Sequence, residues 1–315
     1  MAAGPLLVGT VLVLLVPARG DTVPFTVSGT TQGWQNTGFT VNAPGDVIWI
    51  EANGTIWFAN RGTADTDPNG FGSEKDGTGF AGYESSIVFG SLIGQIDGTL
   101  VPEGDSPHIA QPGQGFVGTE YTEVMPDAGT LSLAYNDGGV TDNSGSFDVT
   151  ISDEFSVFGL VDGETTFQWQ DTGLDIEAGQ FLSIVAEGTI AYNDLTGTET
   201  DPDGFGDKDG TGFAGQYPSI IFGSLIGKIG DTLVPEGDSP YAPAPGTGFV
   251  GSNYSEQMIS SGRLYLAYND AGVLDNDGAF TVSINVQPIP EPGSAALLGL
   301  LGLTVLFRRN QRARG

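Results

Sequence analysis

The chain has 315 residues, with 39 Asp and Glu against 10 Lys and Arg, a single His and no Cys. The absence of Cys excludes disulfides as a source of stability, and a single His cannot supply a His-rich zinc site. The negative charge repels nucleic acid and anionic lipid head groups, so neither is an expected partner. A hydrophobic content of 39% is too high for a disordered acidic chain.

Residues 1–20 have the pattern of a signal peptide. An apolar run over residues 6–16 is too short to span a bilayer, and small residues on both sides of Arg19 are typical of a signal-peptidase site. A basic segment before the run is missing, so a plain apolar tail is the alternative. The pattern predicts an exported protein whose mature part begins at residue 21.

Residues 21–151 are predicted to form β-strands. Apolar residues alternate with polar ones over residues 47–51, 54–58, 130–135 and 146–151, and clusters of Gly, Asn, Asp and Pro separate these segments. Such alternation is typical of antiparallel strands with one buried face, and 50 Gly with 18 Pro leave little room for helices. The sequence therefore predicts an all-β fold built as a β-sandwich.

Residues 169–287 repeat this pattern. The segment Trp34-Gln-Asn-Thr-Gly38 returns as Trp169-Gln-Asp-Thr-Gly173, and Ala134-Tyr-Asn-Asp137 returns as Ala267-Tyr-Asn-Asp270. Because the repeated unit exceeds 100 residues, each copy should be a complete domain with its own core. Residues 152–168 are predicted to be a short linker or an extra strand.

The duplication limits the chemistry that both copies can share. The only His, His108, falls opposite Tyr241 in the second copy. A Ser–His–Asp or Cys–His site in each copy is therefore impossible.

Residues 288–315 have the pattern of a second sorting segment. Pro290-Glu-Pro292 precedes an apolar run over residues 295–307 and four arginines. This order resembles the PEP-CTERM sorting signal of bacterial surface proteins. The resemblance implies processing by an exosortase and a final location at the cell envelope, the outer surface or the extracellular matrix. The same order fits a transmembrane helix with its basic end inside, and whether that helix is retained or cleaved stays open.

Residues 21–287, between the two terminal segments, carry five cations and 38 carboxylates, a net charge near −33. Self-repulsion of this size opposes compaction unless bound cations offset it. Divalent cations are therefore the expected partners of this part of the chain. Membrane contact is expected only through the C-terminal helix before processing.

A cluster of acids and amides follows the same strand in both copies. Carboxylates and amides that bracket a Gly-rich loop can direct several hard oxygens toward one point, which suits the six to eight oxygen ligands of Ca²⁺. Asx-turns that end a strand are the alternative, but recurrence in both copies of so acidic a chain favours the metal. The side chains concerned are Asp137, Asp142 and Asn143 in the first copy and Asp270, Asp275 and Asn276 in the second.

The order of motifs in each copy also resembles a known family. The tryptophan segments quoted above, a Ser-Leu-Ile-Gly-x-Ile segment at residues 91–96 and 224–229, and the repeated Tyr-Asn-Asp together resemble the PA-IL-like galactophilic lectins of bacteria over almost the whole of each copy. The resemblance implies two tandem β-sandwiches of the galactose-binding, jelly-roll type. Each would hold one Ca²⁺ at one end, where the ion coordinates sugar hydroxyls.

The resemblance also implies a ligand set. Besides the six side chains above, it assigns backbone carbonyls to Phe58 and to Val140 or Thr141 in the first copy, and to Tyr192 and to Val273 or Leu274 in the second. The His and Gln that hold galactose in that family have no counterpart in residues 77–82 or 210–215. Calcium is therefore implied, and galactose specificity is not.

A second acidic cluster covers residues 65–76 and 201–209. Alternating acids and Gly suggest a second metal site or contacts to a ligand, although the spacing of an EF-hand loop is not met. A solvated, turn-rich rim loop is the alternative. The candidate side chains are Asp67, Asp76, Asp201, Asp203 and Asp209.

Three classes of function compete. A calcium-dependent carbohydrate-binding protein of the cell surface would use its two sites for avidity toward a neutral glycan or exopolysaccharide. A structural or adhesive envelope protein rigidified by calcium is the alternative. A glycosidase ranks last, because no apolar environment marks one carboxylate as a general acid with a raised pKa. The sequence therefore predicts a lectin-like protein that is not an enzyme.

Overall fold

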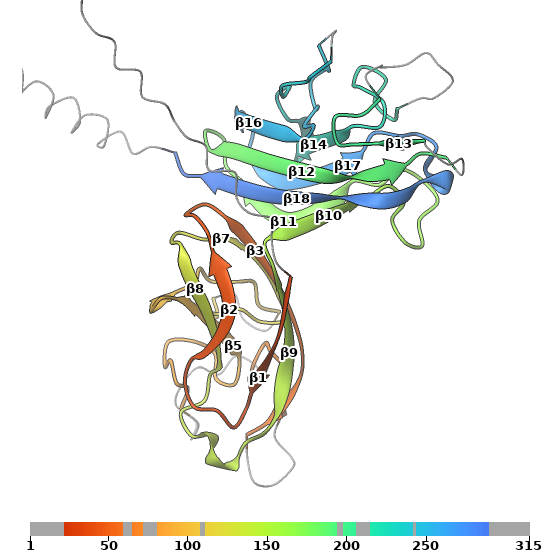
Figure 1. Cartoon of the computed structure of the whole chain (residues 1–315). Coiled ribbons are helices and arrows are strands. Elements are labelled where there is room, and N and C mark those ends of the chain that lie inside the picture. Colours follow the sequence, from red (N-terminus) through yellow and green to blue (C-terminus); the bar gives the residue numbers. More distant parts are fainter. Residues whose placement is uncertain are drawn as a thin grey trace, which may run out of the picture.

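The computed structural model describes residues 22–58, 65–71, 81–107, 111–193, 198–205, 215–241 and 244–289. Regular structure in these residues is almost entirely β-strand, and the strands form four antiparallel sheets (Figure 1). The prediction of an all-β sandwich fold is confirmed. The expected signal peptide, and the apolar run with its arginines near the C-terminus, lie outside the described residues. Within the described ranges, no helix is both long and apolar enough to cross a membrane.

The first sandwich contains two sheets. One has the strand order β1-β9-β3-β4, with β7 paired to β3, and the other has the order β2-β8-β5-β6. The strands are β1 (Val23–Ser28), β2 (Gln35–Val41), β3 (Val47–Trp57), β4 (Asp65–Thr66), β5 (Leu92–Ile96), β6 (Thr99–Leu100), β7 (Glu120–Val124), β8 (Gly129–Tyr135) and β9 (Ser144–Ser152), with the 3₁₀ turn η1 (Val140–Asp142) between β8 and β9.

The second sandwich has the same arrangement, with one sheet ordered β10-β18-β12-β13, β16 paired to β12, and the other ordered β11-β17-β14-β15. Its first strand lies within residues 152–168, so part of this segment is a strand of the second sandwich. The strands are β10 (Glu154–Phe158), β11 (Gln170–Ile176), β12 (Phe181–Ala191), β13 (Glu199–Thr200), β14 (Leu225–Ile229), β15 (Thr232–Leu233), β16 (Asn253–Gln257), β17 (Gly262–Tyr268) and β18 (Asp277–Gln287), with the 3₁₀ turn η2 (Val273–Asp275) before β18.

Alternation along each strand builds the cores. On β9 the side chains of Phe147, Val149 and Ile151 are buried, whereas Asp148 and Thr150 between them are exposed. Successive side chains of a strand point to opposite faces of the sheet, so the apolar set faces the opposite sheet. Burial of each such side chain stabilises the fold by roughly 2 kcal/mol.

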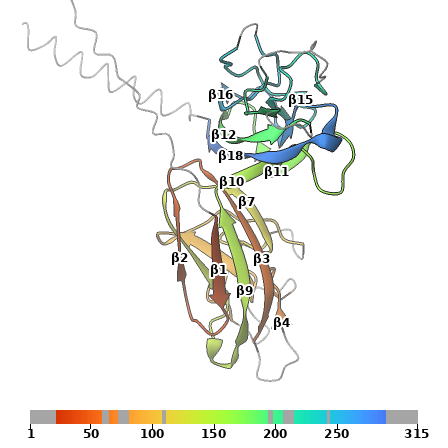
Figure 2. The same cartoon turned by 45° about the vertical axis from the view of Figure 1, so that its right-hand side comes forward.

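The two sandwiches meet at one end of the first. The start of β3 and strand β7 face β10, β11 and β18 of the second sandwich in both views of the chain (Figures 1 and 2). The turn η1 lies at the opposite end, because β9 begins beside the end of β3, where Ser144 pairs with Trp57. In the first sandwich, the junction and the segment after β8 therefore lie at opposite ends.

We predict that Gly54 on β3 tolerates no side chain. Its φ of +111° suits Gly, and a Cβ there would lie 2.5 Å from the carbonyl oxygen of Ser146 on β9. Gly98 also has a positive φ, +94°, but a Cβ there meets nothing within 4 Å. Gly98→Ala should cost about 1 kcal/mol of backbone strain, and Gly54→Ala roughly 2 kcal/mol more. Urea unfolding of the two variants checks this, and equal losses would contradict it.

Candidate metal centre

The segment after β8 brings Asp137 and Asn143 together. The Asn143 Nδ2 atom donates hydrogen bonds of 2.9 Å to Asp137 Oδ2 and 3.1 Å to the carbonyl of Gly29. The backbone N–H of Gly139 donates to the other carboxylate oxygen, Oδ1, at 2.8 Å. Asp137 is 5% exposed and Asn143 7% exposed, so the pair is nearly removed from water.

The amide oxygen of this pair has no partner. Asn143 Oδ1 is inaccessible to water and accepts no hydrogen bond, and the same holds for Asn276 Oδ1 in the second sandwich. Burying an unpaired polar atom costs about 1–3 kcal/mol, and buried side-chain oxygens normally have a donor or a cation beside them. The same amide oxygen is unpaired at equivalent positions of both sandwiches, and its chemistry suits either a hydrogen-bond donor or a cation.

The second sandwich repeats the geometry with Asp270 and Asn276, which are 4% and 6% exposed. The N–H of Gly272 donates to Asp270 Oδ1 at 2.8 Å, and Asn276 Nδ2 donates to the carbonyl of Gly159 at 3.3 Å. Burial raises the pKa of Asp270 above its ordinary value, and hydrogen bonds from Gly272 and Asn276 oppose this shift. Asp275 adds to it by charge repulsion, so it lies near Asp270. A cation beside Asp270 would remove this penalty on the charged form.

The other expected ligands are close to this pair in the chain or across a strand pair. Phe58 directly follows β3, Tyr192 directly follows β12, and both are buried. The last residue of β3 pairs with Ser144, the residue after Asn143. The last residue of β12 pairs with Asp277, the residue after Asn276. The carbonyls of Val140 and Val273 accept hydrogen bonds of 3.3 Å from the backbone N–H groups of Asn143 and Asn276. Asp142 and Asp275 end the turns η1 and η2, with exposed side chains.

This set of donors suits a hard cation. Carboxylate, amide and backbone carbonyl oxygens are the ligands that Ca²⁺ takes in proteins. In the described part of the chain, no three or more His, Cys, Asp and Glu side chains gather closely enough to hold a metal ion. An ion at this pair would therefore depend on amide and carbonyl oxygens for part of its coordination.

The acidic loops are held differently. Asp67 and Asp201 each form an Asx-turn, accepting hydrogen bonds of 2.8 Å and 3.0 Å from the N–H two residues later. Both carboxylate oxygens of Asp203 accept hydrogen bonds from Ser252, one from its N–H and one from its hydroxyl. The carboxylates of Asp67 and Asp201 thus stabilise their own turns, whereas that of Asp203 ties its loop to the segment before β16. Asp76 and Asp209 lie outside the described residues.

Sequence reasoning missed the role of Asn136, which precedes Asp137 and is fully buried. Its Nδ2 atom donates to the carbonyls of Glu84, Ile87 and Val88, and its Oδ1 accepts from the N–H of Glu84 at 2.7 Å. Asn269 does the same in the second sandwich. This Asn therefore fixes the loop before β5 or β14. The repeated Tyr-Asn-Asp contains this Asn, but the motif was interpreted through its Asp as a metal ligand, and no loop anchor was predicted.

Comparisons with known proteins give a limited result. No family model matches the chain, and no curated protein matches it. A solved structure described as "EclA N-terminal domain; PllA-like lectin" is similar at 24% identity, covering 41% of this chain and 93% of that one, with a TM-score of 0.30. The strand order of the two sandwiches defines the fold.

We predict that Asn136→Ala destabilises the fold strongly. The change leaves three carbonyls and one N–H of the loop before β5 without their partner, so the free energy of unfolding should fall by roughly 3 kcal/mol. Asn53→Ala, at an exposed position on β3, should change it by less than about 0.5 kcal/mol. Chemical denaturation measures both, and a loss below about 1 kcal/mol for Asn136→Ala would contradict the role of this side chain.

Proposed function

We propose that each sandwich binds one Ca²⁺ at its buried Asp–Asn pair. The main support is that the side-chain amide oxygens of Asn143 and Asn276 have no hydrogen-bond partner. Each of these residues lies beside a buried carboxylate. A calcium ion would give the amide oxygen a partner and the carboxylate a countercharge. The residues that would hold it are Asp137, Asp142, Asn143, Phe58 and Val140 in the first sandwich and Asp270, Asp275, Asn276, Tyr192 and Val273 in the second.

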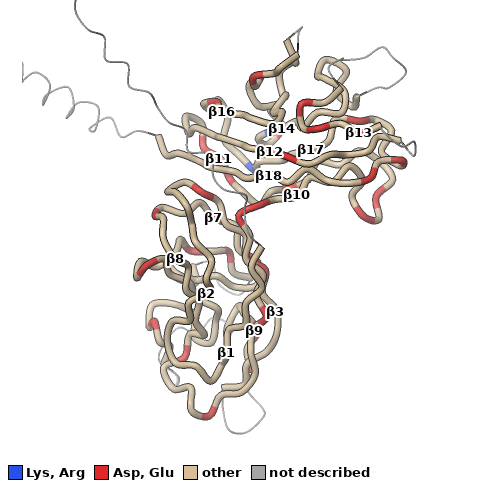
Figure 3. The backbone as a smooth tube through the Cα atoms, viewed as in Figure 1, with Lys and Arg blue, Asp and Glu red and all other residues tan. Residues whose placement is uncertain are grey.

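The charge of the chain supports the proposal. Acidic residues lie over both sandwiches, whereas the described residues include only two cations, Lys228 and Arg263 (Figure 3). Lys228 lies over the rings of Trp169 and Tyr265, and Arg263 pairs with acids of β11. Neither of these two cations contacts the Asp–Asn pairs, and a bound metal ion would supply positive charge there.

We further propose that the bound ion presents free coordination positions to the hydroxyls of a neutral glycan. An aromatic surface supports this. Gln32 donates to the carbonyl of Gly138, and the N–H of Gly138 donates to Ala81, so the loop carrying Tyr83 lies against the proposed metal loop. Tyr83 is 39% exposed and packs edge-on against Trp34. An exposed aromatic ring can stack on the apolar face of a sugar.

The proposed setting is an exported protein of the cell envelope, outer surface or extracellular matrix, processed by an exosortase. This setting rests on residues 1–20 and 288–315 of the sequence. Two sugar sites on one chain would give avidity toward a repetitive glycan of such a surface.

A structural role for calcium, without sugar, is the second candidate. The burial of the pair favours this role, since Asp137 is only 5% exposed and Asn143 only 7%. An ion enclosed this far would rigidify the turns between β8 and β9 without an open coordination position for a ligand.

Calcium should raise the melting temperature of the protein. A ligand that binds only the folded state at about 100 times its Kd adds roughly 2.7 kcal/mol per site, which corresponds to several degrees. Asp137→Ala should lower this increase, and the double variant with Asp270→Ala should abolish it. Asp148→Ala, which removes an exposed carboxylate of β9, is the control and should keep the full increase. Identical melting with calcium and with excess chelator would exclude the sites.

Sugar binding is tested separately on an array of neutral glycans in millimolar calcium. We expect binding that chelator removes, a moderate loss in Asp137→Ala or Asp270→Ala, and a much larger loss in the double variant because avidity disappears with it. Polyanionic glycans should bind poorly at low salt, since the chain is acidic. Absence of binding, together with intact stabilisation by calcium, would favour the structural role.

A further inference from the structure

The outer face of the sheet β11-β17-β14-β15 carries a lysine that lies over two aromatic rings. The Lys228 ammonium is 5.2 Å from the centre of the Trp169 ring and 4.9 Å from that of Tyr265. The neighbouring strand residues Ile229 and Leu264 belong to the core between the two sheets. Because successive side chains of a strand alternate between faces, Lys228 and Tyr265 point outward. Attraction to the two rings holds the ammonium in place on this face.

Two further aromatic side chains extend this surface. The rings of Phe167 and Tyr217 pack edge-on against Trp169, with their centroids 5.5 Å and 5.6 Å from its ring. The Trp169 Nε1 atom donates a 3.2 Å hydrogen bond to the Tyr217 hydroxyl, which can donate its own proton to a ligand oxygen. The Lys228 patch consists of five partly exposed side chains: Phe167, Trp169, Tyr217, Lys228 and Tyr265.

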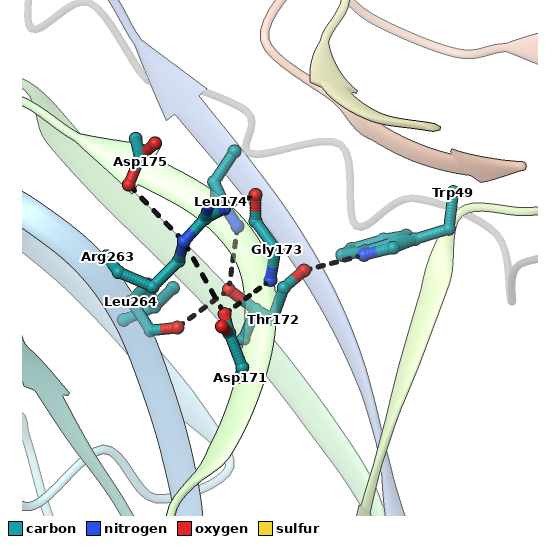
Figure 4. A network of polar contacts seen from close by, with 8 residues as sticks. All are labelled: Trp49, Asp171, Thr172, Gly173, Leu174, Asp175, Arg263 and Leu264. Carbon is teal, nitrogen blue, oxygen red and sulfur yellow. Dashed lines mark hydrogen bonds and ion pairs between the residues drawn. The ribbon is translucent and has the colours of Figure 1, made fainter. Parts of the chain in front are cut away.

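No carboxylate of the described residues forms an ion pair with Lys228, although the chain is strongly acidic. Asp171 of β11 lies directly opposite Tyr265, but it is already engaged. It pairs with Arg263 at 3.6 Å and accepts a 2.9 Å hydrogen bond from the N–H of Gly173 (Figure 4). The ammonium of Lys228 is therefore available to an anionic group of a ligand.

The first sandwich lacks this patch. Trp34, the counterpart of Trp169, keeps an aromatic neighbour in Tyr83, but no cation of the described residues lies over its ring. Strand register and spacing give the other counterparts, which are Gln95 for Lys228, Ser132 for Tyr265 and Gln32 for Phe167. The combination of a cation with several rings thus distinguishes the second sandwich from the first.

The contact between the sandwiches uses other groups. Trp49 of β3 donates a 2.9 Å hydrogen bond to the carbonyl of Thr172 on β11 (Figure 4), and its ring lies 6.1 Å from that of Phe155 on β10. The Thr172 side chain is buried and donates to the carbonyl of Leu264. The side chains of the Lys228 patch stay partly exposed with both sandwiches in place, so a ligand can reach them.

We propose that the Lys228 patch is a saccharide site that needs no calcium and prefers a sugar ring with one carboxylate, as in a uronic acid. The carboxylate pairs with the Lys228 ammonium, and the apolar face of the sugar ring contacts the exposed aromatic surface. The Tyr217 hydroxyl donates to a sugar oxygen. Carbohydrate as the class of ligand rests on the proposed function, whereas the place of binding and the charge preference rest on the patch itself.

The patch is separate from the proposed calcium site of the second sandwich. Lys228 lies opposite Tyr265, in the middle of β17, whereas Asp270 lies beyond the end of that strand. None of the patch side chains is an expected calcium ligand. Removal of calcium should therefore leave binding at the patch intact.

A single carboxylate suits the patch better than many. Lys228 is its only cation, and the surrounding chain is acidic. Further carboxylates on the same glycan would be repelled by the chain without finding a partner in the patch. The expected ligand is therefore a glycan with isolated acidic sugars and not a polyanion.

Isothermal titration calorimetry of the full chain in excess chelator tests the proposal. One probe is a trisaccharide that ends in a single glucuronic acid, and the other is the same trisaccharide ending in glucose. We expect one site per chain, with the acidic probe bound roughly tenfold more tightly than the neutral one at low salt. This preference should shrink several-fold in about 0.5 M NaCl, which screens the ion pair.

The first sandwich suggests matched variants. Lys228→Gln introduces the side chain found at Gln95 and should make the two affinities equal, whereas Lys228→Arg keeps the charge and should retain the preference. Tyr265→Ser copies Ser132 and should weaken binding of both probes, because it removes part of the ring surface. Thermal unfolding verifies that each variant remains folded.

Three results would overturn the proposal. The first is that the wild type in chelator binds neither probe or binds both equally. The second is an undiminished preference for the acidic probe in Lys228→Gln. The third is binding that appears only when calcium is present, which would support the calcium site and exclude the patch. The first two leave the calcium proposal untouched, since that proposal is tested with Asp137→Ala and Asp270→Ala.

Discussion

Each sandwich buries a carboxylate beside an amide, Asp137 with Asn143 in the first and Asp270 with Asn276 in the second. The structure of the loops around each pair depends on how these polar groups are satisfied. A carboxylate and an amide are removed from water together, and the amide oxygen faces no donor. Such groups are stable in a protein interior when a cation or a further donor accompanies them. The proposed calcium ion meets both needs, because it offsets the carboxylate charge and coordinates the amide oxygen. The turns η1 and η2 and the entry into β9 and β18 are arranged around this point.

The two sandwiches share one strand order but differ in their surfaces. The position of Trp49, third on β3, is occupied by Ser183 on β12, so the end of the fold that docks in the first copy lacks its aromatic anchor in the second. The Asp–Asn pairs lie away from this end in both copies. The contact between the sandwiches therefore uses an end of the first sandwich that is distinct from the end with its Asp–Asn pair.

The sequence was sufficient to predict the features that depend on local alternation and on repeated motifs. Alternation predicted the sandwich fold, and recurrence singled out Asp137 and Asn143, which the structure brings within one hydrogen bond. It did not indicate that Asn136 anchors a loop some 50 residues earlier in the chain, because that role depends on packing between distant segments.

The most direct test of the calcium proposal is a crystal structure grown in millimolar calcium, with anomalous diffraction data that locate the ions. The account predicts one anomalous peak in each sandwich, within calcium-ligand distance of Asp137 and Asn143 oxygens in the first and of Asp270 and Asn276 oxygens in the second. The amide oxygen of each Asn should point at the ion. A structure without a peak at either pair, in which these amide oxygens find protein or water donors instead, would contradict it.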